Sequence, residues 1–352
     1  MPFPPAERLS PRADFPWPPP PSDAAAPPRS VDPAPFPEAA PTPFPEPAVW
    51  LYPARASASR AQDTTKPARE TVPPADTADR PVVLIHGFRG DHHGLALIAH
   101  DLRRRDVWVP DLPGFGRTSP PARGLDLDAF TAFIRALCAA CEAATGRRPL
   151  LVGHSFGSVL VAHAVARDSA ICTAVALLSP IVQPPLEGSA RFLTQLTRLY
   201  YAAGRALPQP AGAALLAQPV IVRAMSEVMA TSRDRMTRAF IHDQHARHFS
   251  DYADRTSLAQ AYEVSTRHTV TEAAAGLAHS AHPLLVVAGD DDLIAPLPAA
   301  RGFVEDLRGL GADVDLQELG GVGHLLHYER PHHVAGAIEE FTAGLDAEGM
   351  QD

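Results

Sequence analysis

Six short apolar runs recur along the chain from Pro81 onward, and helical stretches separate them. The runs are PVVLIHG (81–87), VWVPDLPGFG (107–116), RPLLVGHS (148–155), TAVALLSP (173–180), HPLLVVAGDDD (282–292) and, more weakly, DVDLQELGG (313–321). Runs of this kind are typical of strands that are buried on both faces of a parallel sheet. The helical stretches lie at 126–145, 156–167, 297–310 and 331–345. The alternation predicts an α/β fold, with a mostly parallel central sheet, right-handed crossovers and helices on both faces.

Three intervals depart from this alternation and suggest the domain organisation. The first 50 residues hold 18 of the 38 prolines, so residues 1–47 are expected to be a disordered arm, although its PxxP-like pieces could also bind a partner. AVWLY at 48–52 is a candidate edge strand, and the polar stretch at 55–80 is expected to be a mobile loop. Residues 181–281 have no strong strand pattern and predict a helical cap, inserted into a core of residues 48–180 and 282–352.

A serine lies at the turn between a predicted strand and a predicted helix. Residues 153–157 read GHSFG, which has the form G-x-S-x-G. A tight strand-to-helix turn leaves no room for side chains at the two glycine positions, and it exposes the serine hydroxyl at its apex. The N-terminus of the following helix favours negative charge at the same place. Ser155 is therefore the predicted nucleophile.

A serine hydroxyl needs a base, and the base needs a carboxylate that orients it. Of the 16 histidines, His324 fits best, because it lies in a glycine-rich loop between the last predicted strand and the last predicted helix. His154 is expected to project from the wrong side of the turn, and His327 to be a surface or packing residue. Three consecutive candidates for the acid follow the strand at 282–289: Asp290, Asp291 and Asp292.

These segments together resemble the α/β-hydrolase superfamily, from about Ala48 to the C-terminus. The resemblance implies the acid, because GDDDLIAP at 289–296 matches a G-x-x-D-x-x-x-P segment whose fourth position is Asp292. The order Ser155, Asp292, His324 is the one expected for that fold. LIHGF at 84–88 resembles the family's H-G segment, which implies an oxyanion hole formed by the backbone N–H groups of Phe88 and Phe156, with His86 shaping the loop. PDLPGFGRT at 110–118 is also typical of the superfamily and is expected to be structural.

The expected activity is that of a serine hydrolase acting through an acyl-enzyme on a small to medium, apolar carboxylic ester. Apolar cap residues are candidates for the ceiling of the pocket, although such residues at helical spacing are more often simply core. They are Phe192, Leu196, Tyr200, Tyr201, Met225, Met229 and Phe249. A C–C bond hydrolase, a lactonase or a perhydrolase could use the same triad. A non-catalytic, hydrolase-like binding protein is the alternative outside enzymes.

Composition argues against several other classes. The net charge of −9 disfavours nucleic acid as a partner, so the expected partner is a small-molecule substrate. No secretory signal and no membrane-spanning run is visible, and a cytoplasmic location is the expectation. No cofactor is implied. The cluster His86, Asp91, His92, His93 lacks a settled metal-ligand spacing, and Cys138 and Cys141 lie within a helical pattern, so neither predicts a metal or redox site.

Overall fold

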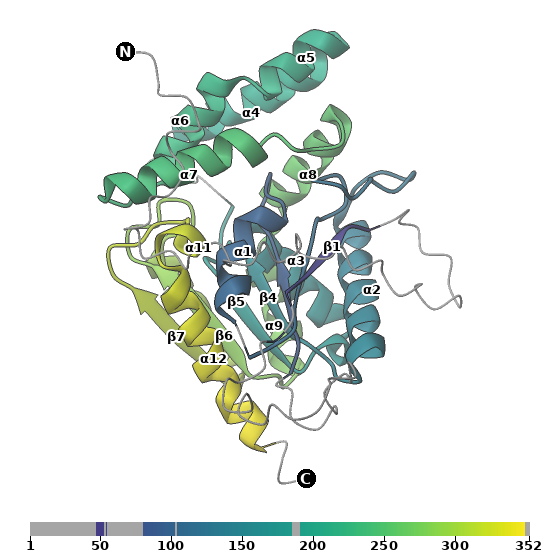
Figure 1. The fold of residues 1–352 in the computed structure, drawn as a ribbon, viewed down its shortest axis with the longest axis vertical. Coiled ribbons are helices and arrows are strands. Elements are labelled where there is room, and N and C mark those ends of the chain that lie inside the picture. Colours follow the sequence, from purple (N-terminus) through teal and green to yellow (C-terminus); the bar gives the residue numbers. More distant parts are fainter. Residues whose placement is uncertain (1–46, 53, 55–79, 103, 185–190, 349–352) are drawn as a thin grey trace, which may run out of the picture.

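The predicted apolar runs form one seven-stranded sheet with the order β1-β3-β2-β4-β5-β6-β7 (Figure 1). The strands are β1 (Val49–Tyr52), β2 (Val82–Ile85), β3 (Val107–Pro110), β4 (Leu150–His154), β5 (Ala174–Leu178), β6 (Leu284–Gly289) and β7 (Val314–Leu319). β1 pairs antiparallel with β3 at the edge of the sheet, and all other neighbours pair in parallel. The α/β fold class expected from the sequence is confirmed, and so is the edge strand.

The computed structural model describes residues 47–52, 54, 80–102, 104–184 and 191–348. Apart from Pro47 and Arg80 at their borders, the predicted arm (1–47) and the predicted mobile loop (55–80) lie outside the described residues. The side chains of Phe192 and Leu196 lie outside them as well.

Helices cover both faces of the sheet because side chains along each strand alternate between the faces. In β2, Val83 and Ile85 pack into one apolar cluster, and Val82 and Leu84 pack into another. The first cluster includes α2 (Leu127–Thr145), α3 (Phe156–Arg167), α9 (Ala274–His279) and α10 (Leu297–Gly309). The second includes α1 (His92–Asp101), α11 (Leu326–Glu329) and α12 (Pro331–Glu348). Each fully buried aliphatic side chain contributes about 1.5–3 kcal/mol to stability, so both layers hold the sheet.

A set of helices lies between β5 and β6. Its members are α4 (Arg191–Ala206), α5 (Gln209–Leu216), α6 (Pro219–Met229), α7 (Arg235–His248) and α8 (Arg255–Arg267). Helices α4 to α7 form a separate layer above the sheet in Figure 1. The short helix η4 (Thr271–Ala273) and α9 follow, and α9 packs on α3 beside the sheet. The predicted cap interval 181–281 therefore includes a last segment that belongs to the sheet layers. The remaining short helix, η3 (Ser169–Ile171), precedes β5.

Cys138 and Cys141 lie inside α2 and are fully buried. Burial raises the pKa of both thiols, to about 12 for Cys141. Because the thiolate is the reactive form, these side chains act as core residues, as expected. Within the described part of the chain, no helix has the length and apolar character that crossing a membrane requires.

Candidate active site

Ser155 occupies a strained turn between β4 and α3. Its φ is 53°, a left-handed value that non-glycine residues rarely adopt, and its amide donates to the Leu178 carbonyl at 2.9 Å. The flanking glycines are sterically required. A Cβ on Gly153 would lie 2.4 Å from the Gly157 carbonyl oxygen, and a Cβ on Gly157 would lie 2.3 Å from the Ile85 carbonyl oxygen. The turn therefore depends on close backbone contact among β2, β4 and α3.

The structure brings Ser155, His324 and Asp292 into one hydrogen-bonded chain. Ser155 Oγ lies 2.7 Å from His324 Nε2, and His324 Nδ1 lies 2.9 Å from Asp292 Oδ2. A carboxylate can only accept, so Nδ1 carries the proton and the neutral ring presents Nε2 as an acceptor to the serine hydroxyl. This is the tautomer that a general base needs.

Of the three consecutive aspartates at 290–292, Asp292 is the one that contacts His324. Its Oδ1 accepts from the amides of Ile294 and Ala295, each at 2.8 Å, which fixes the carboxylate in the loop. Burial disfavours its charge, but the electrostatic attraction and hydrogen bond of His324 outweigh burial and lower the pKa of Asp292. Asp290 and Asp291 are exposed, and Asp290 accepts from the Gly321 amide at 2.6 Å.

Two buried residues hold the loop that carries His324. His154 Nε2 donates to the His324 carbonyl at 3.0 Å, and burial lowers the pKa of His154 to about 3, so its ring stays neutral. Glu329 accepts from the Gly323 amide at 3.1 Å and from the cap amides of Thr231 and Ser232 at 3.0 Å. Nothing in the sequence indicated that His154 contacts the loop that carries His324. Glu329 was also missed, and it links that loop to the cap.

The backbone N–H groups of Phe88 and Phe156 lie in the two segments that meet at Ser155. Phe156 is the first residue of α3, and a Cβ on Gly87 would lie 3.2 Å from Ser155 Cβ. Among the described residues neither amide has an acceptor. His86 shapes this loop. Its Nδ1 donates to the Gly87 carbonyl at 2.9 Å, and its Nε2 accepts from the Leu112 amide at 2.9 Å.

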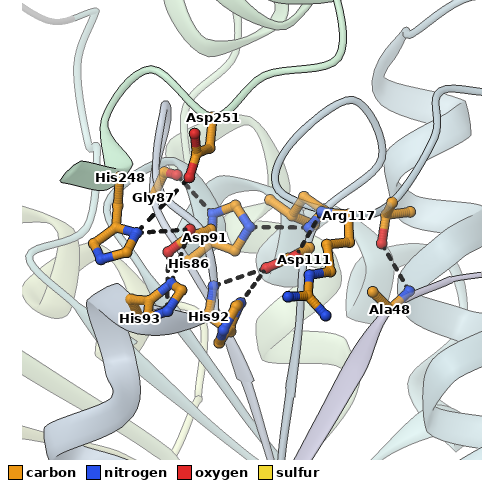
Figure 2. A network of polar contacts seen from close by, with 12 residues as sticks. Ala48, His86, Gly87, Asp91, His92, His93, Asp111, Arg117, His248 and Asp251 are labelled. Carbon is orange, nitrogen blue, oxygen red and sulfur yellow. Dashed lines mark hydrogen bonds and ion pairs between the residues drawn. The ribbon is translucent and has the colours of Figure 1, made fainter. Parts of the chain in front are cut away.

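A polar network extends from this loop to the cap, as Figure 2 shows. Asp91 accepts from the His93 amide at 2.9 Å, which caps α1, and its Oδ2 lies 3.0 Å from His93 Nδ1 and 3.6 Å from His248 Nδ1. His92 bonds to Asp111 through both its amide and its ring, at 2.9 and 2.8 Å. Asp91 with His92 and His93, or with His248 and Asp251, offers ligand atoms close enough for a metal ion. The Asp91 carboxylate caps α1 and the His92 ring bonds to Asp111, while both ring nitrogens of His86 bond to the backbone.

A cavity of about 590 Å³ lies between the sheet and the cap, and Ser155 and His324 line it. Most of its lining is apolar or aromatic. Five residues named from the sequence as candidate ceiling residues are among the lining side chains: Tyr200, Tyr201, Met225, Met229 and Phe249. The chain thus places a hydrogen-bonded serine in the wall of a mainly apolar pocket.

Comparison with known proteins agrees with this arrangement. Residues 82–337, more than half of the chain, match the alpha/beta hydrolase family. The chain belongs to this family. Among curated proteins, this hydrolase is similar to the biotin biosynthesis bifunctional protein BioHC of Cellvibrio japonicus, with 27% identity over 268 residues. The match covers 76% of this chain and 48% of that protein, so the chain spans about half the length of its curated relative.

Solved structures of esterases share the fold of this hydrolase. One is a thermophilic esterase from Thermogutta terrifontis, with a TM-score of 0.60 and 19% identity over 85% of this chain and 94% of that chain. Another is the esterase EaEST from Exiguobacterium antarcticum, with a TM-score of 0.60 and 13% identity over 85% and 96%. At such identities the likeness shows the fold alone.

Proposed function

We propose that this hydrolase cleaves carboxylic esters through a serine acyl-enzyme. One observation carries the proposal, namely the hydrogen-bonded chain from Ser155 Oγ through His324 to Asp292, whose serine and histidine line a mainly apolar cavity. An isolated serine hydroxyl is a weak nucleophile, and a neutral histidine at 2.7 Å is the base that activates it.

Acylation begins when a substrate ester carbonyl lies against Ser155. Ser155 Oγ attacks the carbonyl carbon while His324 Nε2 takes the hydroxyl proton, and Asp292 stabilises the resulting imidazolium. The carbonyl oxygen becomes an oxyanion, which the N–H groups of Phe88 and Phe156 and the N-terminus of α3 stabilise. His324 then gives its proton to the alcohol oxygen, the C–O bond breaks and the acyl group stays on Ser155.

Deacylation repeats these steps with water. His324 takes a proton from the water molecule, the hydroxyl oxygen attacks the acyl carbon, and Ser155 leaves with the proton that His324 returns. The products are a carboxylic acid and an alcohol. No other reactant is needed, so no cofactor enters the proposal.

The lining of the cavity supports a small to medium, mainly apolar ester as the substrate. Its volume of about 590 Å³ falls within the usual range for small-molecule sites. The two solved proteins that share this fold are esterases, which is consistent with the proposed class of reaction. We therefore expect the cavity to bind a small-molecule substrate.

The test is hydrolysis of a graded series of ethyl esters by the purified protein. We expect turnover by the wild type, its loss by at least about 10³-fold in Ser155→Ala, and an unchanged rate in Ser169→Ala, which alters an exposed serine. A fluorophosphonate should label the wild type on the peptide that contains Ser155. Absence of both turnover and labelling would refute the proposal, and turnover of lactones or ring-fission diketones alone would redirect it.

A further inference from the structure

Arg89 is a buried cation next to the proposed oxyanion loop. It follows Phe88 directly, has a φ of 61° and is 1% exposed, and it lines the same cavity as Ser155. Its guanidinium group lies against the cap. Nε donates to the Phe249 carbonyl at 3.0 Å and Nη2 to the Leu216 carbonyl at 2.9 Å. These two contacts tie the core loop to the ends of α7 and α5.

The charge of Arg89 has no counter-ion among the described residues. No carboxylate lies within 4.0 Å of it, and the other charged group of the cavity wall, Asp91, is engaged by His93 and α1. Nη1 has only two contacts, both at 3.4 Å, to the hydroxyl oxygens of Tyr200 and Tyr201. Usual N–H to O distances are about 2.9–3.0 Å, so these are weak bonds. A buried charge without a counter-ion is costly, and an anion supplied by a ligand would relieve that cost.

Tyr201 adds a second donor at the same place. Its side chain lines the cavity, is 5% exposed and accepts from Arg89. Burial raises its pKa to about 12, so the hydroxyl keeps its proton. The Tyr200 hydroxyl donates to the Leu216 carbonyl at 2.7 Å, whereas no described residue accepts the Tyr201 proton. Nη1 of Arg89 and the Tyr201 O–H are therefore adjacent donors without a strong acceptor.

We propose that Arg89 and Tyr201 form a subsite for a carboxylate of the substrate. The substrate class becomes an ester that bears a second, ionised carboxyl group, such as the half-ester of a dicarboxylic acid. A carboxylate fits better than a phosphate, because it carries a single charge and the site offers one cation and one hydroxyl donor in an otherwise mainly apolar wall. This assignment rests on the proposed ester hydrolysis at Ser155, which lines the same cavity.

Selectivity between matched esters tests the subsite. Monoethyl succinate, adipate and suberate are each compared with the ethyl alkanoate of the same length, in which a methyl group replaces the carboxylate. We expect kcat/KM of the best half-ester to exceed that of its alkyl partner by about 10- to 150-fold, the range of one hydrogen bond between charged groups. The optimal chain length would measure the span from Ser155 to Arg89.

Variants separate recognition from a purely structural role of Arg89. Arg89→Met should abolish the preference for half-esters, Arg89→Lys should retain part of it, and Tyr201→Phe should reduce it about 5- to 10-fold while the buried cation remains. Arg301→Met makes the same change of charge at an exposed residue. It should leave the ratio of kcat/KM between the half-ester and its alkyl partner unchanged. A fall in melting temperature with an unaltered ratio in both Arg89→Met and Tyr201→Phe would show that Arg89 only joins the cap to the core.

A binding measurement is independent of turnover. Ser155→Ala protein should bind hexanoate at least about 10-fold more tightly than hexanol by calorimetry, and Arg89→Met in that background should remove the difference. Equal binding of the two ligands, or tighter binding of hexyl phosphate, would overturn the carboxylate subsite. Wild-type turnover of alkyl esters without any preference for half-esters would refute the subsite alone. Absence of all ester turnover would refute the proposed function, while binding by Ser155→Ala would still test the subsite.

Discussion

At the scale of single residues, the carboxylate run at 290–292 offers a sharp test of the site. Asp292→Asn should reduce kcat about 10³- to 10⁴-fold, because an amide opposite Nδ1 favours the tautomer that cannot accept the serine proton. The matched control is Asp291→Asn, one residue earlier and exposed, which should leave kcat within about twofold. Steady-state hydrolysis of one ethyl ester measures both variants. A larger loss in Asp291→Asn than in Asp292→Asn would contradict the assignment of the acid.

At the scale of elements, helix α6 of the cap forms part of the cavity wall and should select among acyl groups. Met225 lines the cavity, whereas Met236 on α7 is 43% exposed and does not. Met225→Ala should change the ratio of kcat/KM between long and short acyl esters by about 10- to 200-fold, since one apolar contact supplies that range. Met236→Ala should leave the ratio unchanged. If both variants kept the wild-type ratio of kcat/KM between long and short acyl esters, the acyl group would not contact α6.

At the scale of the whole molecule, buried neutral histidines should make folding stability depend on pH. Burial lowers the pKa of His154 and His245 to about 3, and it also lowers the pKa of His327. In the unfolded chain a histidine titrates at about 6.5, so between about pH 6.5 and 3 the unfolded state binds protons that the folded state excludes. The free energy of unfolding should therefore fall on acidification, by about 1.4 kcal/mol per pH unit for each such histidine.

Urea unfolding at several pH values between 7.5 and 4.5 measures this slope. Below about pH 6.5, His245→Gln should flatten it by about 1.4 kcal/mol per pH unit, whereas His333→Gln, at an exposed residue of α12, should leave it unchanged. Parallel curves for the wild type and His245→Gln would show that His245 takes up a proton in the folded state.

Much of the fold and the order of the site residues followed from the sequence alone, because the deciding interactions are local. Continuous apolar runs predicted the buried parallel strands, and the described strands β2 to β7 lie within them. The glycines at 153 and 157 predicted the tight turn, and a Cβ on Gly153 would collide with the carbonyl oxygen of Gly157 in the same turn. By local sequence pattern, the three aspartates at 290–292 were equally good candidates for the acid of the site. Only the resemblance to a family distinguished Asp292.

Tertiary structure alone decided the contacts between distant segments. The bond from Arg89 to Phe249 joins residues 160 positions apart, and Glu329 reaches Thr231 across 98 positions. No periodicity or spacing encodes such pairs, because they depend on how the cap helices pack over the ends of the strands. The same holds for α9, whose sequence resembles that of the cap helices although it packs beside the sheet. Backbone sterics and hydrophobic alternation act within a few residues of the chain, whereas the charge and shape of the cavity arise only when both layers meet.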